Sequence, residues 1–171
     1  MVWGMSLSTF TLLHVLISLL GIASGFVVVF GMLGGKRLDG WTAFFLATTV
    51  ATSVTGFGFP FDHLLPSHKV GIISLAVLTI AILARYGLHL AGAWCWIYVV
   101  CATMALYLNV FVLVVQSFLK VTTLKAMAPT QTEPPFLVAQ SLVLLLFIVL
   151  GTMVVKRFRN VSVGHQVARR P

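Results

Sequence analysis

The sequence has very few charged residues, and acidic residues are the rarest of them. Only 8% of the 171 residues are Asp, Glu, Lys or Arg, and just three are acidic, whereas 60% are hydrophobic and the mean hydropathy is +1.08. Soluble domains carry about 25% charged residues, and disordered chains are poor in hydrophobic ones. This composition excludes both classes and leaves an integral membrane protein.

Cysteine is also scarce, which limits the redox and metal chemistry open to the chain. The two cysteines, Cys95 and Cys101, lie six positions apart in an apolar run. That spacing is about 240° of rotation on a helix, so the two side chains point apart and cannot form a disulfide. The sequence contains no CxxC, zinc-finger or CxxCH motif, which excludes thiol–disulfide exchange and c-type haem attachment.

Five long apolar segments are present instead, each close to the roughly 20 residues that a membrane-spanning helix needs. They cover residues 7–33, 41–59, 68–86, 94–119 and 136–155. We therefore predict an all-α polytopic transmembrane helix bundle that forms a single domain over residues 1–171. Because only residues 87–93 separate the third segment from the fourth, the alternative is a four-span bundle with a re-entrant piece within residues 68–119.

Basic residues divide unequally between the two ends of such a bundle. If the N-terminus is outside, eight of the eleven Lys and Arg residues fall on the inner side, and five of these lie in the tail at residues 156–171. The positive-inside rule therefore predicts an outer N-terminus and a basic cytoplasmic tail. This topology signal, together with attraction to anionic lipid, accounts for the net charge of +8, so no nucleic-acid partner is expected.

Three stretches carry a resemblance to a known family: GKRLDGW at residues 35–41, PSHKVG at 66–71 and APTQTEPPF at 128–136. They resemble segments of small bacterial integral membrane proteins known as hypothetical proteins, and the resemblance covers most of the chain. It implies a bacterial inner (plasma) membrane and transfers no activity. In layout alone, a small bundle with histidines near one face is also similar to b-type cytochromes of the cytochrome b561 kind.

Histidines on different segments indicate where a cofactor would bind. His14 and His68 fall at similar depth in the outer half of the bundle, with His63 nearby, and imidazole ligates haem iron, copper and zinc. His14 shares a helical face with Gly21 and Gly25, which we expect to point into the bundle. We therefore predict His14 and His68 as the metal ligands of haem b, with His63, Gly21 and Gly25 beside it. The alternative is that the glycines only let helices pack closely.

Three side-chain amides in later segments fall at overlapping depths in the same outer half: Asn109, Gln116 and Gln140. An unpaired polar group in hydrocarbon costs a few kcal/mol. We therefore expect a polar pocket bounded by these amides together with His14 and His68.

The inner end is expected to anchor the bundle in the membrane interface. Arg85 is predicted to snorkel its guanidinium out to the interfacial region. Four aromatic residues are predicted to form the inner aromatic belt around it: Tyr86, Trp94, Trp96 and Tyr98.

Three kinds of function are compatible with these features. The first is electron transfer, in which haem b exchanges electrons with quinone. The second is a non-catalytic accessory or scaffold role, in contact with other membrane subunits or with further copies of the chain. The third is a small-solute transporter or channel lined by Thr48, Thr52 and the three amides, although the sequence shows no inverted repeat and no carboxylate within a span. No motif assigns an enzyme activity.

Overall fold

The computed structural model describes the backbone of residues 4–59 and 66–167, and the side chains of residues 4–59 and 68–158. Every secondary-structure element within these residues is a helix, which confirms the all-α class. In chain order they are α1 (Leu7–Leu33), α2 (Asp39–Gly56), α3 (Pro66–Ile82), the π-helical turn η1 (Leu83–Gly87), α4 (Trp94–Lys120), α5 (Thr122–Met127) and α6 (Pro134–Val167).

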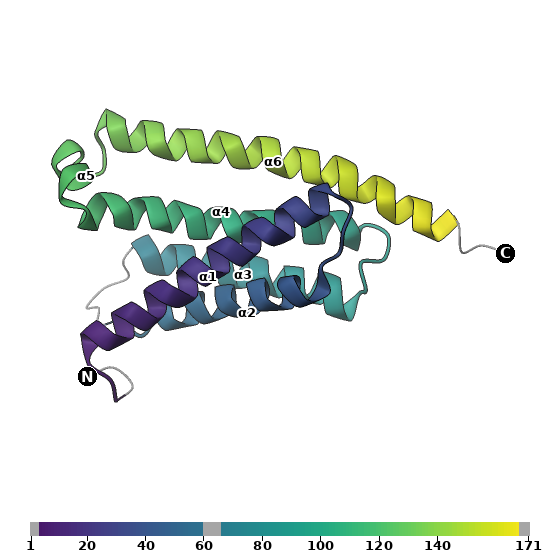
Figure 1. Ribbon diagram of the computed structural model, residues 1–171, viewed down its shortest axis with the longest axis horizontal. Coiled ribbons are helices and arrows are strands. Elements are labelled where there is room, and N and C mark those ends of the chain that lie inside the picture. The colour runs from purple at the N-terminus through teal and green to yellow at the C-terminus, as the bar shows by residue number, and fades with distance from the viewer. Residues whose placement is uncertain (1–3, 60–65, 168–171) are drawn as a thin grey trace.

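The five long helices run back and forth along the bundle, so the two termini lie at opposite ends (Figure 1). Helices α1, α2, α3 and α4 pack together, and α6 lies along α4. The α1–α2 and α3–α4 connections lie at the same end as the C-terminus. We call this the basic end, because the two connections carry Lys36, Arg37 and Arg85. The N-terminus and α5 lie at the opposite end.

Four helical segments are long and apolar enough to cross a membrane: Leu7–Leu33, His68–Gly87, Trp94–Lys120 and Pro134–Phe158. The prediction of five spans is therefore met in part. Helix α2, which covers most of the second apolar segment, is not among the four. Its 18 residues include one aspartate and six serines or threonines, so its composition is more polar than that of the others.

The third and fourth segments form two separate helices. Helix α3 continues into η1, and a tight turn then reverses the chain before α4 begins at Trp94. His89, Leu90 and Gly92 of that turn have positive φ angles of 49°, 58° and 53°. Residues 68–119 therefore contain a sharp reversal between two helices, and no re-entrant piece.

The connection from α1 to α2 is equally tight. Gly35 adopts a φ of 72°, and the Lys36 N–H donates to the Gly31 carbonyl at 2.8 Å, which closes α1 with a Schellman motif. Leu38, the residue before α2, lies in the left-handed region with a φ of 40° and makes no side-chain cap hydrogen bond. Its side chain packs directly on Gly31, where no Cβ would fit. The short loop thereby brings the start of α2 to the basic end.

The apolar core lies where α1, α2 and α4 meet. Phe45 of α2 and Leu106 of α4 are fully buried and both rest on Gly25 of α1. A Cβ at Gly25 would lie 2.6 Å from the Leu106 side chain and 2.8 Å from Phe45. The glycine therefore permits the close approach of three helices at this level.

Helix α6 is the least buried of the spanning helices. Its buried side chains form one stripe at helical spacing, Phe147, Leu150, Val154 and Phe158. Its remaining faces carry exposed leucines, valines and isoleucines. Lipid tails are as apolar as leucine, so this helix suits a position with lipid on most sides.

Candidate functional site

His14 points into the bundle, as predicted, and joins α1 to α2. Its Nδ1 lies 2.8 Å from Thr55 Oγ1, and its ring packs edge-on against Phe59 at a centroid distance of 5.2 Å. The Thr55 hydroxyl already donates its proton to the Ala51 carbonyl at 2.7 Å. The Thr55 hydroxyl oxygen can therefore accept a hydrogen bond from His14 Nδ1.

Gly21 and Gly25 also point inward, but other helices cover them. A Cβ at Gly21 would lie 3.3 Å from Thr48 Oγ1, and at Gly25 the side chains of Phe45 and Leu106 fill the space. A haem lying against this face would need that volume, so the residues present do not fit it. The packing supports the alternative role for both glycines, close helix contact.

His68 lies in the first turns of α3 and is only 3% exposed. Its ring stacks on Phe57 at a centroid distance of 5.5 Å, whereas His14 contacts Phe59, so the histidines contact different residues just after α2. His63 lies outside the described residues. Within the described part of the chain, no group of three or more His, Cys, Asp or Glu residues could hold a metal ion. Metal ligation by His14 and His68 stays a prediction.

The predicted pocket amides make contacts between different pairs of helices. Asn109 Nδ2 donates to Thr49 Oγ1 at 3.3 Å, which joins α4 to α2. Gln140 Nε2 donates to the carbonyl of residue 111 at 3.2 Å, which joins α6 to α4. Gln116 is half-buried on α4. A single pocket that unites these amides with the histidines stays a prediction.

Helix α2 presents a polar face to its neighbours. Thr42, Thr49 and Ser53 are buried at spacings that place them on one side of the helix. Ser53 donates to Ser74 of α3 at 3.0 Å. The Thr52 hydroxyl is buried without a hydrogen-bond partner within the described structure. Buried polar groups are costly unless they are partnered, so this face is where water or a polar solute is expected.

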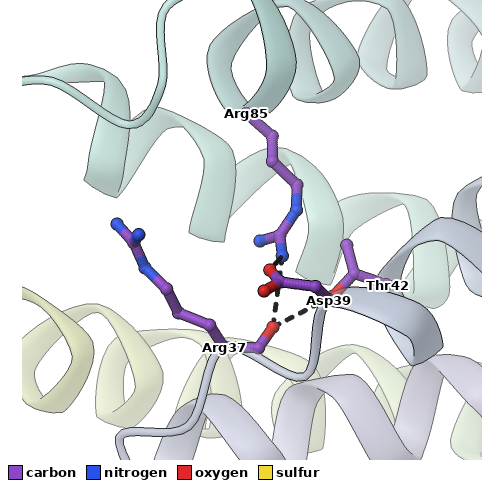
Figure 2. A network of polar contacts seen from close by, with 4 residues as sticks. All are labelled: Arg37, Asp39, Thr42 and Arg85. Carbon is purple, nitrogen blue, oxygen red and sulfur yellow. Dashed lines mark hydrogen bonds and ion pairs between the residues drawn. The ribbon is translucent and has the colours of Figure 1, made fainter.

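A charged cluster lies at the basic end of this polar face (Figure 2). Arg85 of η1 forms an ion pair with Asp39, the first residue of α2. The same nitrogen, Nη2, donates to the Arg37 carbonyl at 3.3 Å, and Thr42 Oγ1 donates to that carbonyl at 3.3 Å. The cluster therefore ties the start of α2 to the end of α3.

Arg85 does not snorkel, which corrects the prediction made for it. Its side chain is only 5% exposed, and its Cζ lies 5.2 Å from the centre of the Tyr98 ring and 5.8 Å from that of Tyr86. Tyr98 is fully buried and so does not belong to an interfacial aromatic belt, whereas Tyr86 and Trp96 are exposed. The carboxylate of Asp39 and the aromatic rings compensate the buried guanidinium.

One signal in the sequence could have located this cluster. Of the three acidic residues, only Asp39 falls among the basic residues of the inner side. A buried arginine needs a counter-charge, so Asp39 was the available partner for Arg85. Its position two residues after Lys36-Arg37, between two apolar segments, suggested an ordinary loop residue instead.

A cavity of about 150 Å³ opens beside the cluster. It is lined by Arg37, Asp39, Arg85, Tyr86, His89 and Leu90. The Arg85 Nη1 is buried and has no hydrogen-bond partner within the described structure. The Tyr98 hydroxyl lies close to Thr42 and Arg85 without forming a well-aligned hydrogen bond.

Backbone strain is concentrated around the same cavity. Leu38, His89 and Leu90 all have left-handed φ angles, and such conformations cost about 1–3 kcal/mol each for residues with a side chain. The π-helical turn that carries Arg85 is a further irregularity of the kind found at functional sites. The basic end therefore has more features typical of a binding site than the end that carries His14 and His68.

Comparisons of the chain with family models, with curated proteins and with solved structures find no match.

Proposed function

We propose that the chain is a five-span protein of the bacterial inner membrane, with its N-terminus outside and its C-terminus in the cytoplasm. In this arrangement α2 crosses the membrane in addition to the four helices that are apolar enough to cross alone. It packs on α1 and α3, and Thr49 of its polar face accepts a hydrogen bond from Asn109 of α4. Its exposed large side chains are apolar: Trp41, Phe44 and Val54. A helix too polar to cross lipid alone can cross inside a bundle that shields its hydroxyl groups. The position of the termini at opposite ends supports an odd number of crossings (Figure 1).

Within that topology, we propose that the bundle transports a small polar solute along the polar face of α2. Polar residues reach into the interior from both ends. At the outer end are the His14–Thr55 and Asn109–Thr49 contacts. At the basic end is the Arg85 cluster. In membrane proteins, polar groups in the interior mark substrate and ion pathways.

The observation that carries this proposal is the apolar layer between the two polar regions. Thr42 and Thr49 are seven residues apart, which is about 10 Å along a helix. Between them, Phe45 of α2 and Leu106 of α4 close on Gly25 of α1. These side chains belong to a longer buried apolar core. An apolar region between two polar ones is the arrangement of a hydrophobic gate, which blocks passage by excluding water.

Solute flux through proteoliposomes tests the proposal. Purified protein is reconstituted, and light scattering follows vesicle swelling in a panel of small polar and anionic solutes. We expect Phe45→Ala and Leu106→Ala to raise flux, because each opens the apolar layer. Phe147→Ala is the matched control, since Phe147 is buried on α6, packed against Phe26 and Tyr107. Vesicles that remain as tight as empty liposomes with all of these proteins would overturn the transport proposal.

The two other functions predicted from the sequence would give different results with the same purified protein. Electron transfer through haem b requires a Soret band that disappears in both His14→Ala and His68→Ala. An accessory role requires co-purification with other membrane subunits and no flux. The filled surface at Gly21 and Gly25 favours transport over the haem hypothesis.

A further inference from the structure

We propose that the cavity at the basic end binds an anionic group, a phosphate or carboxylate, on the guanidinium of Arg85. Only the identification of this anion as the transported solute rests on the transport function proposed above. Binding itself is argued from the charges, the unpartnered donors and the space around Arg85.

The cavity carries an excess of positive charge. Arg37 and Arg85 both line it, against the single carboxylate of Asp39. His89 also lines it. Within the described lining, therefore, at least one positive charge is left without a carboxylate.

Arg85 also has donors left over. Asp39 and the Arg37 carbonyl both engage Nη2, whereas Nη1 is buried without a partner in the described structure. A buried donor on a charged group is costly to leave unsatisfied. Nη1 is covered by protein atoms, so an oxyanion reaches this edge of the guanidinium by taking the place of the Asp39 carboxylate. Guanidinium groups are suited to phosphate and carboxylate through two parallel hydrogen bonds.

The size of the cavity is sufficient for one small anionic group. A cavity of about 150 Å³ is similar to one that holds a benzene molecule. It has room for a phosphate or a carboxylate group. Arg37 is a second cationic residue of the lining, although its side chain extends away from the Arg85–Asp39 pair (Figure 2).

Asp39 competes with the anion for the same guanidinium. Its side chain is 85% exposed, whereas that of Arg85 is 5% exposed. Water can solvate the exposed carboxylate when it leaves the pair, but the permanently charged, buried guanidinium cannot follow it. Arg85 therefore exchanges one counter-ion for another, and removal of the Asp39 carboxylate should strengthen anion binding.

The test is anion-dependent thermal unfolding of the full chain in detergent, at constant ionic strength. Inorganic phosphate and acetate are titrated against the wild type, Asp39→Asn, Arg85→Lys and Arg85→Gln. We expect saturable stabilisation of the wild type, about tenfold tighter apparent binding in Asp39→Asn, and no saturable effect in Arg85→Gln. Arg85→Lys should bind weakly because lysine lacks the planar donor pair. Lys125→Gln, at the opposite end, removes one exposed positive charge as the control and should match the wild type.

A second arm identifies the source of the anion. The same proteins are placed in mixed micelles that contain phosphatidic acid or, as a neutral reference, phosphatidylcholine. Stabilisation by phosphatidic acid alone identifies a lipid headgroup as the ligand, and stabilisation by inorganic phosphate or acetate identifies a soluble anion. If Arg85→Gln does not fold, the double variant Asp39→Asn/Arg85→Gln removes both charges and should fold without responding to anions.

The outcomes separate this proposal from the transport proposal. Anion binding without flux in proteoliposomes supports the cavity and overturns transport. Flux that does not depend on Arg85 supports transport and overturns the anion as its solute. An equal response of the wild type, Asp39→Asn and Arg85→Gln to every anion would overturn the binding proposal.

Discussion

At the scale of single residues, the most informative feature is that a buried arginine takes its counter-ion from an exposed aspartate. Arg85 and Asp39 are 46 residues apart in the sequence, and their contact joins η1 to the start of α2. Burial of the guanidinium makes the pair important to the fold, while exposure of the carboxylate makes its half of the pair replaceable. The two residues should therefore respond differently to substitution.

Removing the carboxylate of Asp39 should destabilise the fold to a moderate degree. We expect Asp39→Asn to lower the free energy of unfolding by about 1–2 kcal/mol, less than the 3–5 kcal/mol typical of a fully buried pair. The reason is that water reaches the exposed carboxylate and already weakens the interaction. Denaturant titration in detergent measures the change. A loss as large as that of a fully buried pair would show that Asp39 is shielded in the membrane.

Glycines in the first two helices should differ sharply in their tolerance of a methyl group. Gly25→Ala should destabilise by about 1–3 kcal/mol, because its Cβ would overlap the side chains of Leu106 and Phe45. Gly40→Ala meets nothing within 4 Å and lies in α2, so better helix propensity should leave it neutral or up to about 1 kcal/mol more stable. Thermal unfolding of the two variants side by side gives the comparison. Equal effects would show that the three helices do not meet closely at Gly25.

At the scale of elements, hydropathy was sufficient to predict that the apolar segments are helices. The ends of several helices also have local causes that can be recognised in a sequence, such as Gly34-Gly35 after α1 and Pro134 at the start of α6. Hydropathy does not report which face of a helix meets which neighbour. The contacts of Thr49 with Asn109 and of Arg85 with Asp39 depend on that lateral packing, and so neither could be derived from composition.

The π-helical turn after α3 could not be predicted for a related reason. It contains no proline, and its residues, LARYG, are ordinary for a helix. What distinguishes it is that Arg85 reaches Asp39 from this position. The snorkelling prediction failed because it considered the arginine within its own helix and not beside the start of α2.

The loop before α6 has a pH response of its own. Partial desolvation raises the pKa of Glu133, but hydrogen bonds from the Thr130 N–H and hydroxyl and from the Thr132 N–H lower it by more. The net pKa therefore lies below the ordinary value of 4.5. A lowered carboxyl pKa contributes stability that is present above the unfolded-state pKa and is lost as the pH falls through the folded-state pKa.

We therefore expect the loop to keep its hydrogen bonds at neutral pH and to lose them only below pH 4.5. NMR titration of the Thr130 and Thr132 amide shifts measures the midpoint. Glu133→Gln should abolish the transition and provides the control. A midpoint above the ordinary value would mean that desolvation outweighs the hydrogen bonds.

At the scale of the whole molecule, the two ends of the bundle differ in charge, and this difference predicts its orientation. Reporter fusions after Phe59 and at Pro171 test the five-span arrangement. We expect alkaline phosphatase to be active after Phe59 and inactive at Pro171, with the opposite pattern for a fluorescent reporter that matures only in the cytoplasm. A third fusion, after Arg37, tests whether α2 crosses: the five-span arrangement predicts no phosphatase activity there. The same reporter pattern after Arg37 and after Phe59 would show that α2 does not cross the membrane, and phosphatase activity after Arg37 and at Pro171 but not after Phe59 would reverse the orientation.

The polar face of α2 has a consequence for how the protein is made. Ribosomes deliver α2 before the helices that partner it, because Ser74, Arg85 and Asn109 all come later in the chain. Until α3 and α4 emerge, the hydroxyl groups of α2 have only α1 to shield them. In the proposed five-span arrangement, insertion of α2 should therefore be completed late, when the ion pair to η1 closes. Insertion of the second helix then depends on the third and the fourth.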